Sequence, residues 1–123
     1  MTRIELFSRA DDWVGFAVGK TVFREGEPGE FMYVVVEGEV EIAAAGRVLE
    51  VAGPGSIIGE LALIDHAPRS ATAIARTAAR LVPVDAKRFQ FMVQQTPFFA
   101  LQVMSIMAER LRRWTAPIEP APR

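Results

Sequence analysis

The central part of the sequence, residues 20–85, is a succession of short β-rich runs separated by glycine-containing turns. The run at 31–36 ends at Glu37-Gly38, and the residues after it alternate apolar and charged side chains. Ala45-Gly46-Arg47 and Gly53-Pro54-Gly55 mark two further turns. We expect strands at 31–36, 40–42, 48–51, 71–77 and 81–84. Short strands at this spacing predict a closed antiparallel roll, a jelly-roll-like β-barrel.

The hydrophobic period changes after Asp85, which predicts helices at the C-terminal end of the roll. Asp85 is a suitable N-cap for a helix that runs to about Gln94. Thr96 and Pro97 predict the N-cap and first residue of a second helix, which runs to about Trp114. The mixed apolar and charged residues before the roll, at 3–16, predict a short helix or turn.

Length and composition indicate one globular domain, which we place at residues 1–116, followed by a flexible proline-rich tail at 117–123. Half of the residues are hydrophobic, there is no cysteine, and the formal net charge is -1. This charge gives no electrostatic reason to expect nucleic-acid binding. No secretory signal and no apolar run of membrane-spanning length are present, so we expect a cytoplasmic protein without a membrane partner.

The segment at 59–72, GELALIDHAPRSAT, has residue types suited to a sugar–phosphate. Its start predicts the first turn of a short helix, whose free N–H groups attract an anion. Arg69 supplies a planar guanidinium that matches phosphate oxygens, and Ser70 adds a hydroxyl donor. Glu60 only accepts hydrogen bonds at neutral pH and therefore suits ribose hydroxyls. A solvated loop arginine and a glutamate that stabilises the helix dipole are the alternatives without a ligand.

This segment is similar to the phosphate-binding cassette of the cyclic nucleotide-binding domain family. The family includes regulatory subunits of cAMP-dependent protein kinase, cyclic nucleotide-gated channels and the bacterial catabolite activator protein. FREGEPGEFMYVVVEGEVEI at 23–42 resembles the family's early strands, and together the two matches span about residues 20–114. The resemblance implies a mainly β fold, an antiparallel β-roll with flanking helices. For this chain we expect an abbreviated N-terminal helix before the roll and two helices after it.

The resemblance also implies a role for each site residue. Arg69 would contact the cyclic phosphate and Glu60 the ribose 2'-hydroxyl, beside Gly59. Backbone N–H groups would come from Leu61 and Ala62, and from Ala71, whose small side chain lets the phosphate approach.

The end of the second helix corresponds to the lid that family members place over the purine. There Trp114 would stack on the base and Thr115 would offer a hydroxyl, although Trp114 could equally end an apolar seam. Ser70 is more typical of members that bind cAMP than of those that prefer cGMP.

The sequence contains no constellation typical of an enzyme. His66 is the only histidine, so no histidine metal cluster can be assembled. The serines have only this histidine to share as a base, and no strained elbow motif surrounds any of them. We therefore expect a cyclic nucleotide, cAMP before cGMP, as the ligand, with no metal and no cofactor. The alternatives are a module that keeps the roll without binding nucleotide, and a sensor fragment of a larger regulator or channel.

The second predicted helix carries an apolar seam that bears on partners. Ala100, Met104, Met107, Leu111 and Trp114 recur at spacings of four and three. The seam packs on its own barrel in one interpretation. In the other, which the breadth of the apolar arc favours, helix 97–114 pairs with a second copy of the chain. Ligand occupancy would reach a separate effector protein through movement of these helices.

Overall fold

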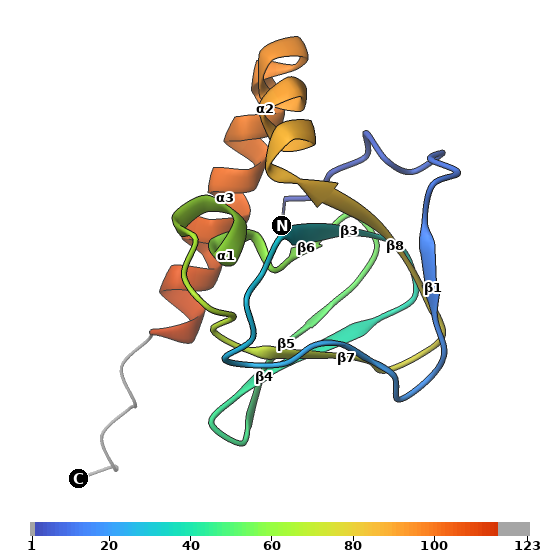
Figure 1. The fold of residues 1–123 in the computed structure, drawn as a ribbon, viewed down its shortest axis with the longest axis vertical. Coiled ribbons are helices and arrows are strands. Elements are labelled where there is room, and N and C mark those ends of the chain that lie inside the picture. The colour runs from blue at the N-terminus through green and yellow to red at the C-terminus, as the bar shows by residue number, and fades with distance from the viewer. Residues whose placement is uncertain (1, 116–123) are drawn as a thin grey trace, which may run out of the picture.

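Two four-stranded antiparallel sheets form a β-roll, and the helices lie together on one side of it (Figure 1). The computed structural model describes residues 2–115, so the predicted tail at 117–123 lies outside the described residues. The strands are β1 (Val14–Phe16), β2 (Thr21–Phe23), β3 (Phe31–Glu37), β4 (Val40–Ala44), β5 (Arg47–Ala52), β6 (Ile57–Ile58), β7 (Thr72–Ala75) and β8 (Ala79–Asp85). The helices are α1 (Glu60–Asp65), α2 (Ala86–Gln95) and α3 (Pro97–Trp114).

The strand order is β1-β8-β3-β6 in one sheet and β2-β7-β4-β5 in the other. Strand β3 pairs with β8 from Phe31 opposite Asp85 to Glu37 opposite Arg80. All five predicted runs form strands, with β7 shorter than expected. Three further short strands were not predicted: β1, β2 and β6. Strand β6 leads directly into α1, so it fixes where the segment at 59–72 begins.

Strands β3 and β8 separate two hydrophobic cores. On one side, Met32 and Val34 of β3 contribute to a core shared with the helices, together with Phe99 and Ile106 of α3. On the other side, Val35 of β3 joins the interior of the roll. Because successive side chains of a strand point to opposite faces, these two strands are buried on both sides and hold the helices against the roll.

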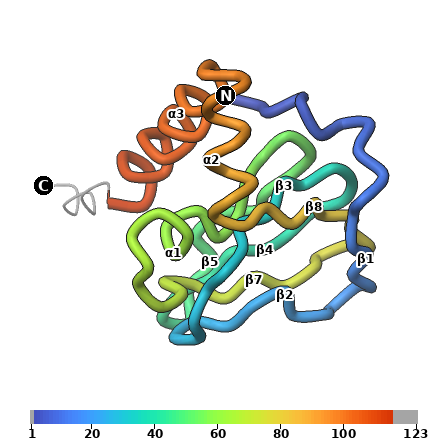
Figure 2. The backbone as a smooth tube through the Cα atoms, turned by 45° about the horizontal axis from the view of Figure 1, so that its top comes forward, coloured from blue at the N-terminus to red at the C-terminus, as the bar shows by residue number. Residues whose placement is uncertain are grey.

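The helix boundaries follow the predicted capping signals closely. The Asp85 side chain caps α2 by accepting a hydrogen bond of 2.7 Å from the backbone N–H of Arg88. Thr96 occupies the N-cap position of α3 and Pro97 is its first residue, but the Thr96 side chain makes no capping bond. Figure 2 shows α3 running along one side of the roll, with its C-terminal half near α1.

The buried stripe of α3 differs from the predicted seam. Phe99, Val103, Ile106 and Arg110 face the protein interior. Within the predicted seam, Met104 and Leu111 are exposed, whereas Ala100, Met107 and Trp114 are half-buried. The single chain therefore does not bury the whole apolar arc, and Phe98 and Leu101 add to the exposed apolar surface of α3.

The N-terminal segment forms turns, and no helix occurs between residue 2 and β1. The expected abbreviated N-terminal helix is therefore wrong, and the alternative of a turn is observed. Ile4 and Phe7 are buried in the helix-side core, which holds the segment without helical hydrogen bonds. Glu109 of α3 accepts hydrogen bonds from the backbone N–H and hydroxyl of Thr2, at 3.1 and 2.7 Å, and these bonds lower the pKa of its carboxyl group.

Candidate functional site

The segment at 59–72 turns sharply out of β6 because of a glycine. Gly59 has a φ of 76°, a left-handed conformation that other residues rarely adopt, and it is the N-cap residue of α1. The helix ends after six residues at His66, which also has a positive φ, of 59°. A loop then returns the chain to β7, and Arg69 lies in this loop. The turn at Gly59 thus brings both ends of the segment to the same side of the roll.

Arg69 points into the protein rather than into solvent. It is 5% exposed, and its Nη1 and Nη2 donate to the carbonyls of Gly59 (3.0 Å) and Phe31 (2.6 Å). Its guanidinium carbon lies 4.0 Å from the centre of the Phe23 ring. Backbone bonds from Arg69 to Gly26 and Glu27 fasten its loop to the turn before β3. The side chain is therefore held in position from several sides.

No carboxylate neutralises Arg69 within the described part of the chain. None of the ion pairs among residues 2–115 includes it, and its buried Nε has no hydrogen-bond partner there. Burial lowers the pKa of Arg69, and the acidic groups of Tyr33, Glu27 and Glu60 partly oppose this shift. Burial of a charge without a partner costs free energy, so a bound anion would stabilise this arginine.

Tyr33 forms part of the aromatic surroundings of Arg69. Its ring stacks on Phe23, with centroids 6.4 Å apart. Burial raises the pKa of the Tyr33 hydroxyl, and the positive charge of Arg69 works against this effect. The aromatic side chains limit the access of water to the arginine, which strengthens its attraction for an anion.

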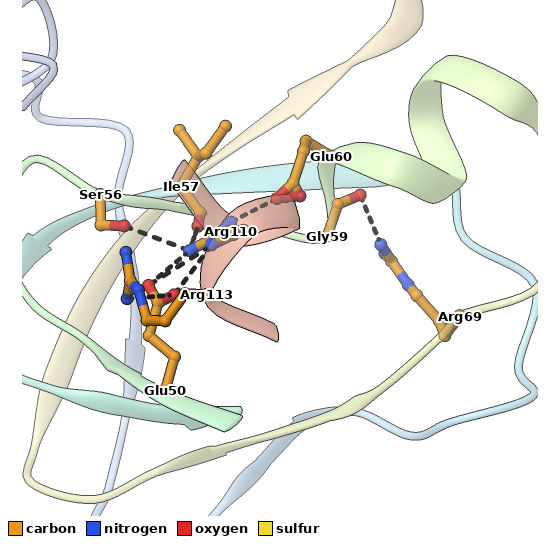
Figure 3. A network of polar contacts seen from close by, with 8 residues as sticks. All are labelled: Glu50, Ser56, Ile57, Gly59, Glu60, Arg69, Arg110 and Arg113. Carbon is orange, nitrogen blue, oxygen red and sulfur yellow. Dashed lines mark hydrogen bonds and ion pairs between the residues drawn. The ribbon is translucent and has the colours of Figure 1, made fainter. Parts of the chain in front are cut away.

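Glu60 is also buried, and it pairs with Arg110 of α3. Nη1 of Arg110 donates to Oε1 of Glu60, and Arg110 is only 4% exposed. The same guanidinium donates through Nε and Nη2 to Glu50 of β5, at 3.0–3.4 Å. It also donates to the hydroxyl of Ser56 at 3.2 Å (Figure 3). A single arginine from α3 thus bridges the glutamate of the 59–72 segment and a strand of the roll.

Arg110 and its network were not predicted, although the sequence contains a signal for them. Arg110 continues the spacing of Phe99, Val103 and Ile106, so it is a charged residue in the stripe that turned out to be buried. A charge in an apolar stripe indicates a buried partner or a ligand. Gly29 was missed as well: a Cβ there would lie 2.7 Å from the Arg69 guanidinium carbon, so the loop packs on Arg69 only because it has glycine.

The structure brings eight of the nine predicted site residues around one small cavity. Its volume is about 30 Å³, which is roughly the space of one water molecule. The lining residues are Phe23, Ile42, Gly59, Glu60, Leu61, Ala62, Arg69, Ser70, Ala71, Arg110 and Trp114. Arg110 and Trp114 close its α3 side, with the Arg110 guanidinium carbon 5.5 Å from the centre of the Trp114 ring. The volume of this cavity is far below the roughly 300–1,000 Å³ of pockets that hold small-molecule ligands.

Thr115, the ninth predicted residue, lies beside a neighbouring cavity. That cavity has a volume of about 270 Å³ and lies between α1 and the last turns of α3. In this position the Thr115 hydroxyl donates to the carbonyl of Leu111. Trp114 lines both cavities, and its indole Nε1 is buried without a partner among the described residues.

Two further features limit the chemistry of the described residues. Between residues 2 and 115, no group of three or more histidine, cysteine or acidic side chains is arranged to hold a metal ion. Within that range, no helix combines the length and the apolar character that crossing a membrane requires.

We expect Gly59→Ala to weaken the site and the fold together. A Cβ at Gly59 would meet Nη1 of Arg69 and would lie 3.1 Å from the Phe23 ring. The positive φ adds about 1–2 kcal/mol of strain, so we expect a loss of about 2 kcal/mol in the free energy of unfolding, measured in urea. Gly53→Ala is the matched control, because a Cβ at Gly53 would have no neighbour within 4 Å. Equal stability of the two variants would contradict this prediction.

Comparison with known proteins agrees with this geometry. The cyclic nucleotide-binding domain family matches residues 13–96. A CRP-like cAMP-activated global transcriptional regulator from Mycobacterium tuberculosis is 37% identical over 105 residues, which cover 81% of this chain and 47% of that protein. A cyclic nucleotide-gated potassium channel from Mesorhizobium japonicum is 42% identical over 82 residues, which cover 67% of this chain and 22% of the channel.

The fold itself matches solved structures. The catabolite activator protein of Thermus thermophilus superposes with a TM-score of 0.72 at 29% identity, covering 81% of this chain and 50% of that one. The chain thus spans about half the length of these regulators. The shared part includes the roll and the segment at 59–72, since the family match extends from residue 13 to residue 96. The chain therefore belongs to the cyclic nucleotide-binding domain family.

Proposed function

We propose that this chain is a cyclic nucleotide sensor that prefers cAMP to cGMP and that signals through the position of α3. The observation that carries the proposal is Arg69, a buried guanidinium that lines the cavity and has no carboxylate partner among residues 2–115. A cyclic phosphate supplies the single negative charge that this arginine lacks. Glu60, on the same cavity, would accept a hydrogen bond from the ribose 2'-hydroxyl.

The remaining site residues would complete the contacts. Ser70 would donate its hydroxyl to the phosphate, while Leu61, Ala62 and Ala71 would present backbone N–H groups. Trp114 would cover the base by stacking, with Thr115 beside it. The preference for cAMP rests on Ser70, and the M. tuberculosis relative is described as cAMP-activated.

The proposed relay follows from the closed cavity. Arg110 and Trp114 of α3 line a cavity that is too small for a nucleotide, so in this proposal ligand binding would displace the end of this helix. A ligand shifts such an equilibrium only by its different affinity for the two positions. We propose that the exposed apolar residues of α3, Phe98, Leu101 and Met104, pair with a second copy of the chain. A separate effector protein would respond to the moved helix.

The small cavity also favours a second candidate, an interaction module that keeps the roll but binds no nucleotide. Calorimetric titration with cAMP, cGMP and the open-chain 5'-AMP distinguishes the two. We expect saturable heat with cAMP, weaker binding of cGMP and no binding of 5'-AMP. At a free cAMP concentration of 100 times Kd, binding should raise the free energy of unfolding by about 2.7 kcal/mol. Absence of heat and of thermal stabilisation at millimolar cAMP and cGMP would favour the interaction module.

Light scattering on the same samples measures the molar mass in solution and so tests whether two copies of the chain form the proposed dimer.

A further inference from the structure

Glu50 holds two of the three arginines at the end of α3, Arg110 and Arg113, although it does not line the small cavity. Its side chain is 10% exposed. It accepts hydrogen bonds from Nε and Nη2 of Arg110, and Nη1 of Arg113 approaches its Oε1 at 2.9 Å (Figure 3). Both arginines belong to the last two turns of α3, so one carboxylate on β5 fixes the helix end to the roll.

The Arg110 guanidinium is shared between Glu50 and the cavity. While Nε and Nη2 bind Glu50, Nη1 binds Glu60, and Nη2 also donates to the carbonyl of Ile57. Every one of these acceptors belongs to the roll or to α1, whereas the donor belongs to α3. The network can therefore form completely only while the end of α3 covers the cavity.

A cyclic nucleotide could replace only part of this network. Its ribose hydroxyl can donate to Glu60 in place of Arg110. Its phosphate is an anion and cannot take the place of the arginines on Glu50. The interactions of Glu50 thus stabilise the closed position of α3 and have no counterpart in the ligand. When the competent state is a small fraction of the population, apparent affinity falls by that fraction.

We propose that Glu50 is a positioning residue that lowers nucleotide affinity by holding α3 closed through Arg110 and Arg113. This inference rests on the proposed function, because it concerns the strength of nucleotide binding at the same cavity. Glu50 needs no contact with the ligand for this role. It acts on the equilibrium between the closed and open positions of α3, and so it sets the concentration at which the sensor responds.

Replacement by the isosteric amide tests the proposal. Glu50→Gln removes the negative charge that holds both arginines. We expect the Kd of this variant for cAMP to be about tenfold lower than that of the wild type, a change within the usual range for coupling between two sites. Arg113→Gln keeps Glu50 and its contact with Arg110, so we expect its affinity for cAMP to rise only about twofold. Glu41→Gln is the matched control, because it removes the same charge from the neighbouring strand β4, outside the network. Thermal unfolding checks that each variant is folded.

A second measurement requires no ligand. It distinguishes the role of Glu50 in holding α3 closed from simple repulsion between the Glu50 charge and an anionic ligand. In a Trp13→Phe background, Trp114 is the only tryptophan. We expect acrylamide to quench its fluorescence at least twofold more efficiently in ligand-free Glu50→Gln than in the parent protein, because the closed position is less populated. Removal of a charge that merely repels the ligand would leave this quenching unchanged.

The outcomes separate the two proposals. Tighter binding by Glu50→Gln, with greater exposure of Trp114, supports the role of Glu50. Binding by the wild type with equal or weaker binding by Glu50→Gln overturns that role and leaves the proposed function intact, as does unchanged quenching. Absence of binding in every folded variant overturns the proposed function and, with it, this inference.

Discussion

Replacing Arg69 with lysine is expected to weaken cyclic nucleotide binding by about a hundredfold, which corresponds to about 2.7 kcal/mol. Lysine keeps the positive charge but has a single ammonium group instead of a planar fork of five donors. In the structure, Nη1 and Nη2 are already bound to two carbonyls, which leaves Nε and the second hydrogens of the fork for a phosphate. A lysine could not satisfy these carbonyls and the ligand at once.

Calorimetry with cAMP measures this loss, and Arg76→Lys is the matched control. Arg76 is exposed, follows β7, and differs from Arg69 in having no contact with the cavity. Urea denaturation should show that the Arg69→Lys variant is folded, with some loss of stability because its contacts with Gly59 and Phe31 are altered. Equal Kd values for Arg69→Lys and the wild type would show that the proposed phosphate contact is wrong, even if the protein binds cAMP.

Replacing Arg110 with methionine is expected to lower the free energy of unfolding by about 3–5 kcal/mol at neutral pH. The substitution leaves the Glu60 carboxylate, which is 6% exposed, without its cation, and Glu50 keeps only Arg113. Breaking a buried ion pair by removing one partner is costly because the remaining charge stays away from water. Methionine fills a similar volume, so the effect reports charge more than packing.

Urea denaturation measures this change, and Arg112→Met is its control, since Arg112 is an exposed residue in the same helical turn. The combined variant Glu50→Gln/Glu60→Gln/Arg110→Met should recover most of the lost stability, because no buried carboxylate is left without its cation. If Arg110→Met were as stable as Arg112→Met, the network would contribute nothing to the closed position, and the proposed role of Glu50 would lose its basis.

Local signals in the sequence predicted the features that depend on neighbouring residues. The Asp85 cap and Pro97 predicted the starts of α2 and α3. The glycine turns marked the ends of the five strands that were predicted. At 59–72, the residue types and the family resemblance together predicted the site. The seven predicted residues of this segment line one cavity. Strand β6, with two residues, is too short for any periodic pattern, and its existence depends on pairing with β3.

The buried face of α3 and the Arg110 network could not be predicted, because both depend on how α3 is rotated about its axis against the roll. The predicted seam through Met104 and Leu111 and the observed stripe through Phe99 and Arg110 are offset by about one residue, and both contain apolar side chains. Helical spacing alone does not decide which of them faces inward, because that depends on the shape of the partner surface. The rotation of α3 also determines whether Arg110 reaches Glu60. The network therefore could not be predicted without knowing how the helix packs.

The attachment of Thr2 makes the beginning of the domain a natural position for a reporter. Thr2 binds Glu109 and Ser105 of α3, while Ile4, two residues later, donates its N–H to the carbonyl of Gly55 at 2.6 Å. The chain thus touches the helix at one point and the roll at the next. A shift of α3 would therefore break the bonds of Thr2 or pull on the anchor at Ile4, so these first residues report the position of the helix from outside the cavity.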